Sequence, residues 1–552
     1  MRVVRVMDAS SARGADEQPS SARPLLTVVV PVFNGGDEVV DNVAVIQHAA
    51  KEGLHGEDVE LVVVSDGSID STAERLLAAR DEANIRVIHY DRNLGKGYAV
   101  KTGALASHGQ WVALIDSDLD LDPRAIATYL HVAQREQLDF AIGSKRHPES
   151  LVHYPRSRRI ASRCYQALNR LLFRLDVRDT QVGLKVFSRA VVDDVVPLLL
   201  VKRFAFDLEL LAVAAALGHD RVRELPVRLN YRFSGSELRS RAVARALVDT
   251  LAIFYRLRML RTYQRKRHLL RGAPALLPEA QPFISMSGDA AAAARLDYDR
   301  LELADSPAEA SGELVAILAP SARPAGNWLT AAAPYFVDRD VAAVVAPDVT
   351  PPRATLGERA AAAVLESRFG GGSRRSRFFP GNVRVVSDGP AASVVARRED
   401  LLAALDARAG SEGLVSWLAD RGRRTVYTPD TSIAAAPPPL VRPHLKATFR
   451  HGRRRGERAR RTRGGTLSAE TTLSLLPLAS ALAGVALVAA GSGAMRAAGI
   501  ALIAAYAAAT VLSTLLAAIR FRSLRVGLLA LPALVATQVT YIVGFVCGFA
   551  RS

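Results

Sequence analysis

Three aspartates follow an apolar run in alternation and could hold a metal ion. Asp116, Asp118 and Asp120 are separated by single residues and come directly after Trp111–Ile115. Hard cations such as Mg²⁺ or Mn²⁺ prefer oxygen ligands, of which few come from protein when phosphate and water supply the rest. Carboxylates at this spacing can share one such ion, and one of them can also hydrogen-bond a ribose. A solvated acidic turn is the alternative, and Asp122 is expected to cap the next helix.

Three further polar turns point to the same chemistry, the binding of a nucleotide with its phosphates. The turn at 65–68 places Asp66 at a strand end, where a carboxylate can accept the imide or amide hydrogen of a base. The segment Asn93–Gly97 puts Lys96 in a glycine-flanked loop that suits contact with phosphate. The segment Pro31–Asn34 ends an apolar run in the same way. Such turns are common singly, but their order and spacing predict one nucleotide site.

Strand-like and helix-like segments alternate through the first 120 residues and would position these turns. The alternation predicts an α/β fold with a doubly wound mixed sheet. Ligands bind beyond the carboxyl ends of the strands in such sheets, and the polar turns all lie at those ends. The predicted strands are 25–32, 59–64, 85–90 and 111–115, and the predicted helices are 39–51, 71–80 and 97–107.

Composition divides the chain into further parts. We expect a mobile tail at 1–23, a first α/β domain at 24–267 and an Ala- and Pro-rich linker at 268–312. A smaller α/β-like block at 313–449 is expected to follow, then a basic juxtamembrane segment at 450–466 and three transmembrane helices at 467–552.

Charge and hydropathy indicate a membrane rather than a nucleic acid as the partner. The formal net charge is +17, from 72 Lys and Arg against 55 Asp and Glu. Arginines concentrate at 450–463, beside three apolar segments that are each long enough to span a bilayer: 471–490, 497–519 and 526–550. Anionic lipid is the ready partner of such basic segments. The positive-inside rule then predicts a multi-pass protein of the plasma membrane, with cytoplasmic catalytic domains and the C-terminus outside.

From about Leu25 to Leu260 the sequence resembles glycosyltransferase family 2, which has the GT-A fold. Within the family it is similar to the dolichyl- and polyprenyl-phosphate glucosyltransferases. The motifs that carry the resemblance are the turns described above and the segments 143–145, 178–187, 204–211 and 230–236.

The resemblance implies a role for each candidate residue. Pro31, Asn34 and Asp66 would hold the nucleoside, and Asp116 would meet the ribose or the metal, with Asp118 and Asp120 as metal ligands. Asp179, Gln181 and Asp207 would line the sugar and acceptor pocket. Arg146 and Arg156 follow the nucleotide site in sequence and would hold a lipid phosphate, although a solvated charged loop explains them equally well. The second block, 313–449, resembles the family weakly, with Ala319 and Ser321 in place of the acids, so it should be a degenerate, non-catalytic domain.

The expected reaction is inverting transfer of a hexose from a nucleotide sugar to a polyprenyl phosphate. Such a phosphate is already anionic near neutral pH, so it needs no strong base. UDP-glucose is the donor that the resemblance favours, and GDP-mannose stays open. Two alternatives remain: extension of a glycan or glycolipid at a sugar hydroxyl, for which Asp207 would be the base, and a non-enzymatic membrane scaffold.

Overall fold

A computed structural model gives the fold of the chain, which separates into two compact units, Met1–Gln281 and Pro282–Ser552. Each unit is described by itself. The backbone is described for residues 5–7, 23–55, 57–90, 93–151, 156–201, 205–229, 240–270, 281–288, 290–389, 391–461 and 469–550. Within these ranges the side chains of 5–7, 156–164, 240–245, 373, 376, 411–412, 461 and 469–474 are not described.

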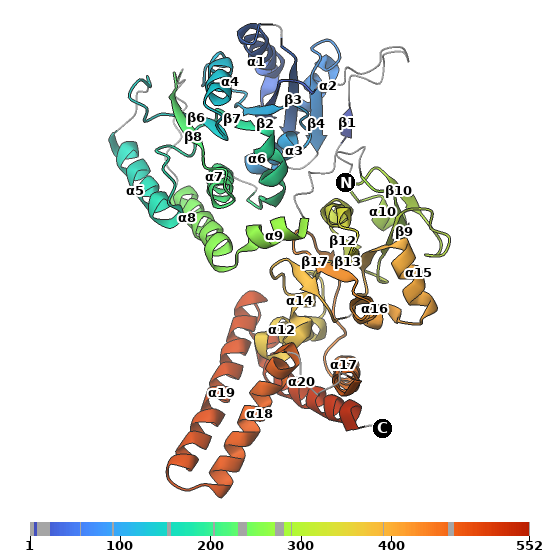
Figure 1. The fold of residues 1–552 in the computed structure, drawn as a ribbon. Helices are drawn as coiled ribbons and strands as arrows, with labels where there is room; N and C mark the ends of the chain where they lie inside the picture. The colour runs from blue at the N-terminus through green and yellow to red at the C-terminus, as the bar shows by residue number, and fades with distance from the viewer. Residues whose placement is uncertain are drawn as a thin grey trace. The chain divides into compact units, whose positions relative to one another are not determined.

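The first unit is built on a mixed eight-stranded sheet, which confirms the predicted α/β class (Figure 1). Its central strand β2 pairs in parallel with β3 and β5, and β3 pairs in parallel with β4. Beyond β5, strand β7 is antiparallel to both of its neighbours. Across the sheet the strands are β1 (Arg5–Met7), β4 (Arg86–Tyr90), β3 (Val59–Asp66), β2 (Leu26–Val32), β5 (Trp111–Leu114), β7 (Lys185–Ser188), β6 (Phe140–Ser144) and β8 (Val222–Pro226). Strand β1 lies within the segment expected to be a mobile tail.

Helices cover both faces of this sheet because the side chains of its strands alternate between two apolar faces. Val28 and Val30 pack into a core that also contains residues of α1 (Val39–Gly53), α2 (Thr72–Ala79) and α4 (Ala125–Arg135). On the other face α3 (Lys96–Leu105) crosses β2 and β3 so closely that a Cβ at Gly103 would lie 3.0 Å from Val64 Cγ2. The remaining helices of the unit are α5 (Arg156–Phe173), α6 (Arg189–Asp194), α7 (Phe206–Ala216), α8 (Ser240–Phe254) and α9 (Thr262–Leu270).

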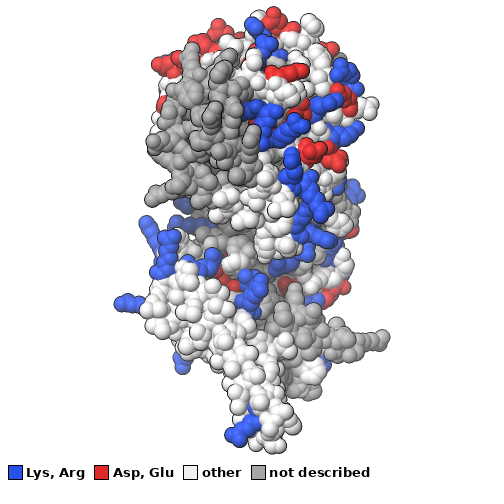
Figure 2. All heavy atoms as spheres, turned by 90° about the vertical axis from the view of Figure 1, so that its left-hand side faces the viewer, with Lys and Arg blue, Asp and Glu red and all other residues white. Residues whose placement is uncertain are grey.

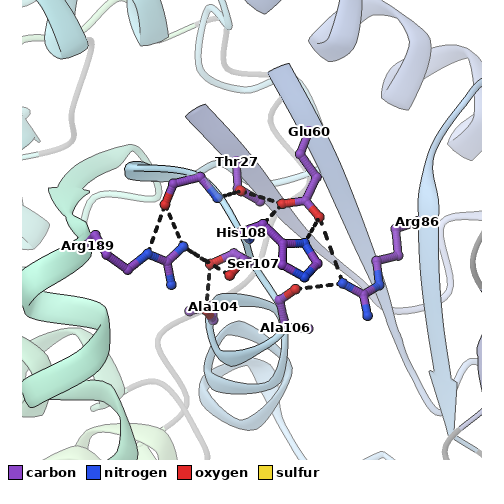
Figure 3. A network of polar contacts seen from close by, with 9 residues as sticks. Thr27, Glu60, Arg86, Ala104, Ala106, Ser107, His108 and Arg189 are labelled. Atoms are coloured by element: carbon purple, nitrogen blue, oxygen red, sulfur yellow. Dashed lines mark hydrogen bonds and ion pairs between the residues drawn. The ribbon is translucent and has the colours of Figure 1, made fainter. Parts of the chain in front are cut away.

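A polar network closes the amino edge of the sheet, opposite the edge that carries the acids (Figure 3). Glu60 accepts hydrogen bonds from Thr27 Oγ1 at 2.6 Å and from the backbone N–H of His108 at 2.8 Å. The His108 ring and Arg86 flank its other oxygen, at 2.8 and 3.8 Å. Burial raises the pKa of Glu60, but the hydrogen bonds from His108 and Thr27 outweigh burial and leave this pKa below its ordinary value. Arg189 completes the network by donating to Gly109 O at 2.8 Å.

The second unit holds a seven-stranded sheet and a three-stranded sheet. Residues 284–303 of the predicted linker are part of this fold, because β9 (Ile284–Ser287) and β10 (Leu301–Leu303) pair in parallel and β9 also pairs with β11 (Leu314–Ile317). The other strands are β12 (Arg323–Pro324), β13 (Val341–Val345), β14 (Asp348–Val349), β15 (Arg384–Val386), β16 (Val394–Arg397), β17 (Arg424–Tyr427) and β18 (Ile433–Ala434). Its helices before the C-terminal region are α10 (Ala290–Ala293), α11 (Trp328–Ala332), α12 (Leu356–Glu366), α13 (Arg368–Gly371), α14 (Arg375–Phe378), α15 (Arg398–Asp406) and α16 (Gly410–Ala419).

The described part of the C-terminal region contains four helices, of which two rather than three are long and apolar enough to span a membrane. These two are α19 (Ala494–Arg520) and α20 (Leu524–Ala550). The prediction of three spans is corrected because the described apolar part of α18 (Ala469–Ala490) is only Leu475–Ala490, which is short of the ~20 residues that a span needs. The basic segment belongs to a long helix, α17 (Arg442–Arg461). Apart from a basic patch at its tip, the projection at the lower end of Figure 2 is uncharged, and exposed apolar side chains of α18 and α19 contribute to this surface.

Candidate active site

A lysine and an aspartate from neighbouring turns form an ion pair at the carboxyl edge of the first sheet. Lys96 begins α3, Asp116 follows β5, and Lys96 Nζ lies 2.5 Å from Asp116 Oδ1. Burial lowers the pKa of Lys96, but the charges of Asp116, Asp207 and Asp118 outweigh burial and raise this pKa above its ordinary value. The ammonium therefore stays charged at neutral pH, among three carboxylates that can attract a cation.

Asp118 and Asp120 extend this acidic cluster. Asp118 Oδ1 accepts the backbone N–H of Asp120 at 3.1 Å, and Leu119 between them has a positive φ of 55°. Burial and the charges of Asp118 and Asp116 raise the pKa of Asp120, although Lys145 opposes them. The three acids thus share one electrostatic environment. Asp122, two residues on, accepts the N–H of Arg124 at 3.0 Å, just before α4 begins.

Two of the residues expected to hold the nucleoside, Asp66 and Asn34, bind the loops of the site to one another. Asp66 is buried at the end of β3 and accepts the N–H groups of Leu94 and Gly95 at 2.8 and 2.9 Å, which fixes the loop in front of Lys96. Asn34 Oδ1 accepts the N–H of Ile69 at 3.0 Å. Pro31 lies in β2 beside Val64 of β3. These contacts give Asp66 and Asn34 a positioning role, and a role in base recognition stays a prediction.

Asp207 joins the cluster through a buried lysine to which the sequence analysis gave no role. Lys185 is 1% exposed, and its Nζ donates to Asp207 Oδ1 at 2.7 Å and to the carbonyl of Val182. The side chain of Asp207 is 17% exposed, so it borders the site while one of its oxygens is engaged.

The residues expected around the sugar and acceptor divide into a fixed and an exposed group. Asp179 accepts the N–H of Lys145 at 3.2 Å and that of Gln181 at 3.2 Å, so it links the loop after β6 to the loop before β7. The side chain of Gln181 is exposed, and Arg146 is half-buried in the loop after β6. Arg156 is the first residue of α5, and its side chain lies outside the described residues.

The carboxylates of the site suit a divalent cation that takes its remaining ligands from the phosphates of a substrate. Among the described residues no group of three or more His, Cys, Asp or Glu is gathered as a complete metal site. Asp118 and Asp120 are nevertheless close enough for the charge of one to raise the pKa of the other. Two carboxylates are the usual protein contribution to a Mg²⁺ ion that also binds substrate phosphates, so Asp118 and Asp120 are the residues that would hold it.

Comparison with known proteins agrees with this geometry. Residues 27–196, from β2 to the end of α6, match the family model described as Glycosyl transferase family 2. This domain of the first unit is therefore similar to glycosyl transferase family 2.

Curated relatives of this domain match over part of their length. Glycosyltransferase AglD of Haloferax volcanii is 33% identical over 224 residues, which cover 39% of this chain and 35% of AglD. The dolichyl-phosphate beta-glucosyltransferase of Dictyostelium discoideum is 30% identical over 206 residues, which cover 35% of this chain and 63% of that protein. A solved structure of glucosyl-3-phosphoglycerate synthase from Mycobacterium tuberculosis, with Mn²⁺, UDP and product, shares 20% identity at a TM-score of 0.32 and covers 42% of this chain and 79% of that one.

Two structural features of the first unit were given no role from the sequence. Gly183 packs against the site so closely that a Cβ there would lie 2.9 Å from Asp116 Cγ and closer still to Oδ2. Glu209 is fully buried and accepts N–H groups of Leu200 and Val201 at 3.0 and 2.8 Å and the hydroxyl of Tyr263 at 2.5 Å. It therefore fixes the start of α7, on which Asp207 lies. The sequence shows only that Gly183 lies two residues before Lys185. Its contact with Asp116 could not be predicted without knowing that β7 pairs antiparallel to its neighbours.

Proposed function

We propose that this chain is a membrane-bound inverting glycosyltransferase that moves a hexose from a nucleotide sugar, with UDP-glucose favoured, to a polyprenyl phosphate. The observation that carries the proposal is the cluster of Lys96, Asp116, Asp118, Asp120 and Asp207 at the carboxyl edge of the family 2 domain. Relatives named as dolichyl-phosphate glucosyltransferases support the choice of acceptor.

The charges of the cluster suit departure of a nucleoside diphosphate. When bound by Asp118 and Asp120, a divalent cation would neutralise the diphosphate. Lys96 adds a fixed ammonium at the start of α3, where the helix dipole also favours an anion. In the transfer, an oxygen of the acceptor phosphate forms a bond to the anomeric carbon. The bond from that carbon to the diphosphate oxygen breaks at the same time, and the diphosphate leaves with the electron pair.

The state of Asp207 favours a phosphate acceptor over a sugar hydroxyl. A hydroxyl must lose its proton to a base, and Asp207 is the candidate that the sequence offered. One oxygen of Asp207 is already engaged by the buried Lys185. A phosphate acceptor is anionic near neutral pH and needs no such base, so the chain's own residues have only to orient it.

The remaining parts of the proposal concern the membrane and the second unit. The apolar helices α19 and α20 supply the membrane anchor, and the exposed arginines of α17 face anionic lipid. In the second unit Ala319 and Ser321 follow β11 where the first unit has acids after β5. A non-catalytic role for that unit follows, and the α/β units lie on the cytoplasmic side of the plasma membrane.

The test is sugar transfer by the full-length protein in membranes. Labelled nucleotide sugars are supplied with Mg²⁺ or Mn²⁺ and a short polyprenyl phosphate, and labelled lipid is measured. We expect Asp118→Asn to reduce transfer by about 100-fold or more. Asp81→Asn removes an exposed carboxylate at the other edge of the sheet and should leave transfer unchanged. Turnover that requires a sugar hydroxyl acceptor would exclude the polyprenyl phosphate. Full transfer by Asp118→Asn would exclude the catalytic role of the cluster.

A further inference from the structure

The second unit contains a buried arginine whose charge no carboxylate balances among the described residues. Arg374 is 9% exposed, and its Nη2 donates to Thr448 Oγ1 of α17 at 3.1 Å. Nearby Arg377 and Arg455 are each paired with an aspartate, at 2.5 and 2.6 Å. Burial lowers the pKa of Arg374 to about 10, so the guanidinium is still charged at neutral pH. An uncompensated buried charge is unfavourable, which indicates that an anion from outside the chain belongs beside it.

Arg374 borders two cavities, and only one of them suits an anion. The larger, of about 480 Å³, is also lined by Asp348 and Asp388, whose charges would repel an anion. The smaller, of about 300 Å³, has no acid in its lining. Its walls are three successive glycines at 370–372, His451 of α17, and Thr537, Gln538 and Tyr541 of α20. The space is narrow and therefore fits only a small group.

We propose that the smaller cavity binds the phosphate group of a membrane lipid. A guanidinium presents a planar fork of donors that matches phosphate oxygens. The pKa of His451 is lowered to about 3 by burial and by Arg374, so the ring is neutral and adds hydrogen-bonding capacity without a second charge. The glycines put no side chain into the space.

The helix that forms the far wall points to a lipid as the source of the phosphate. Thr537, Gln538 and Tyr541 are buried on α20, while Val535, Val539, Val543 and Val546 of the same helix are exposed. The cavity thus lies within one helical turn of an apolar surface on which a lipid chain can rest. This site belongs to the second unit and is independent of the proposed sugar transfer, so binding is measured without turnover.

The experiment measures thermal stability of the full-length protein with and without phosphate groups. One arm adds inorganic phosphate to the protein in neutral detergent. The other arm compares nanodiscs of phosphatidylcholine, in which choline offsets the phosphate charge, with nanodiscs that contain phosphatidylglycerol. A phosphate group at about 100 times its Kd should raise Tm by about 5 °C. A gain with inorganic phosphate identifies free phosphate as a sufficient ligand, and a gain with phosphatidylglycerol alone identifies the lipid headgroup. No gain in either arm overturns the proposal.

Matched variants locate the effect at Arg374. Arg374→Gln should lose the gain, whereas Arg450→Gln, which removes the same charge from an exposed position of α17, should keep it. A gain that persists in Arg374→Gln overturns the proposal. If that variant does not fold, Arg374→Lys is measured, because lysine keeps the charge but lacks the fork. An apparent phosphate affinity at least about tenfold weaker supports the site, and an unchanged affinity refutes it.

Discussion

Replacement of Gly183 by alanine tests whether the position of Asp116 controls activity. The new Cβ would lie 2.9 Å from Asp116 Cγ, where ordinary contacts begin at 3.4 Å, and its approach to Oδ2 is closer still. Gly183 does not have a positive φ, so alanine is compatible with the backbone. The carboxylate must therefore move by roughly 1 Å, which also separates it from Lys96. A misplacement of about 1 Å at a reacting centre costs about 100-fold in rate, or about 2.7 kcal/mol in transition-state stabilisation.

The assay compares kcat/KM for sugar transfer with thermal stability in the same preparation. We expect Gly183→Ala to lose about 100-fold in kcat/KM and to bind nucleoside diphosphate with Mn²⁺ more weakly, while Tm changes by less than about 2 °C. Gly413→Ala is the matched control, because no atom lies within 4 Å of a Cβ there and its φ is not positive. Wild-type activity in Gly183→Ala would refute the reasoning. So would a fall in Tm large enough to explain the lost activity by unfolding.

Three further predictions follow from other contacts. Lys96→Met removes a charged hydrogen-bond donor, so nucleoside diphosphate should inhibit about 10- to 100-fold less strongly; equal inhibition would contradict the role of Lys96. Burial raises the pKa of Glu209 despite its hydrogen bonds, so the folded state holds the proton more tightly than the unfolded state. Stability should therefore fall as pH rises above 4.5, and Glu209→Gln should flatten this dependence in denaturant titrations; an unchanged slope would contradict it. A tag placed after α20 should be cleaved by protease added to the side of the membrane on which the second unit lies, because α17 packs α20 against that unit. A tag that protease on that side does not cleave would contradict this packing.

The acids and Lys96 could be placed from the sequence because their position depends on a general property of parallel sheets. Apolar runs that end in polar turns put those turns at one edge, whatever the pairing order of the strands. The fold class and the neighbourhood of Asp116, Asp118 and Lys96 therefore followed without knowledge of the register. The alternation of side chains in β2, with Val28 and Val29 on opposite faces, was predictable for the same reason.

The other half of the site depends on pairing that local patterns do not encode. Lys185 reaches Asp207 because β7 inserts antiparallel between β5 and β6, and the two residues are 22 positions apart. The same insertion brings Gly183 against Asp116. A buried lysine reads as a polar interruption of a strand until its partner is known. The segment 282–312 escaped for a related reason, since its short strands gain their stability from β11 rather than from their own sequence.

The helix α20 shows why hydropathy alone does not decide membrane crossing. The length and composition of α20 are those of a membrane-spanning helix, but 44% of its apolar stretch is buried in the protein. Gly544 and Gly548 of α20 and Gly452 and Gly456 of α17 sit so close to the opposite backbone that a Cβ at each would overlap a carbonyl oxygen. The helix packed against α20 is α17, which carries the arginine cluster. Arg455 of α17 pairs with Asp388 at 2.6 Å, and Arg458 of α17 pairs with Asp420 at 2.7 Å. Burying those ion pairs at the centre of a bilayer would be costly. In the proposed membrane-bound protein, the C-terminal half of α20 is therefore expected at the membrane surface, where its exposed valines would meet lipid while its glycine face holds α17.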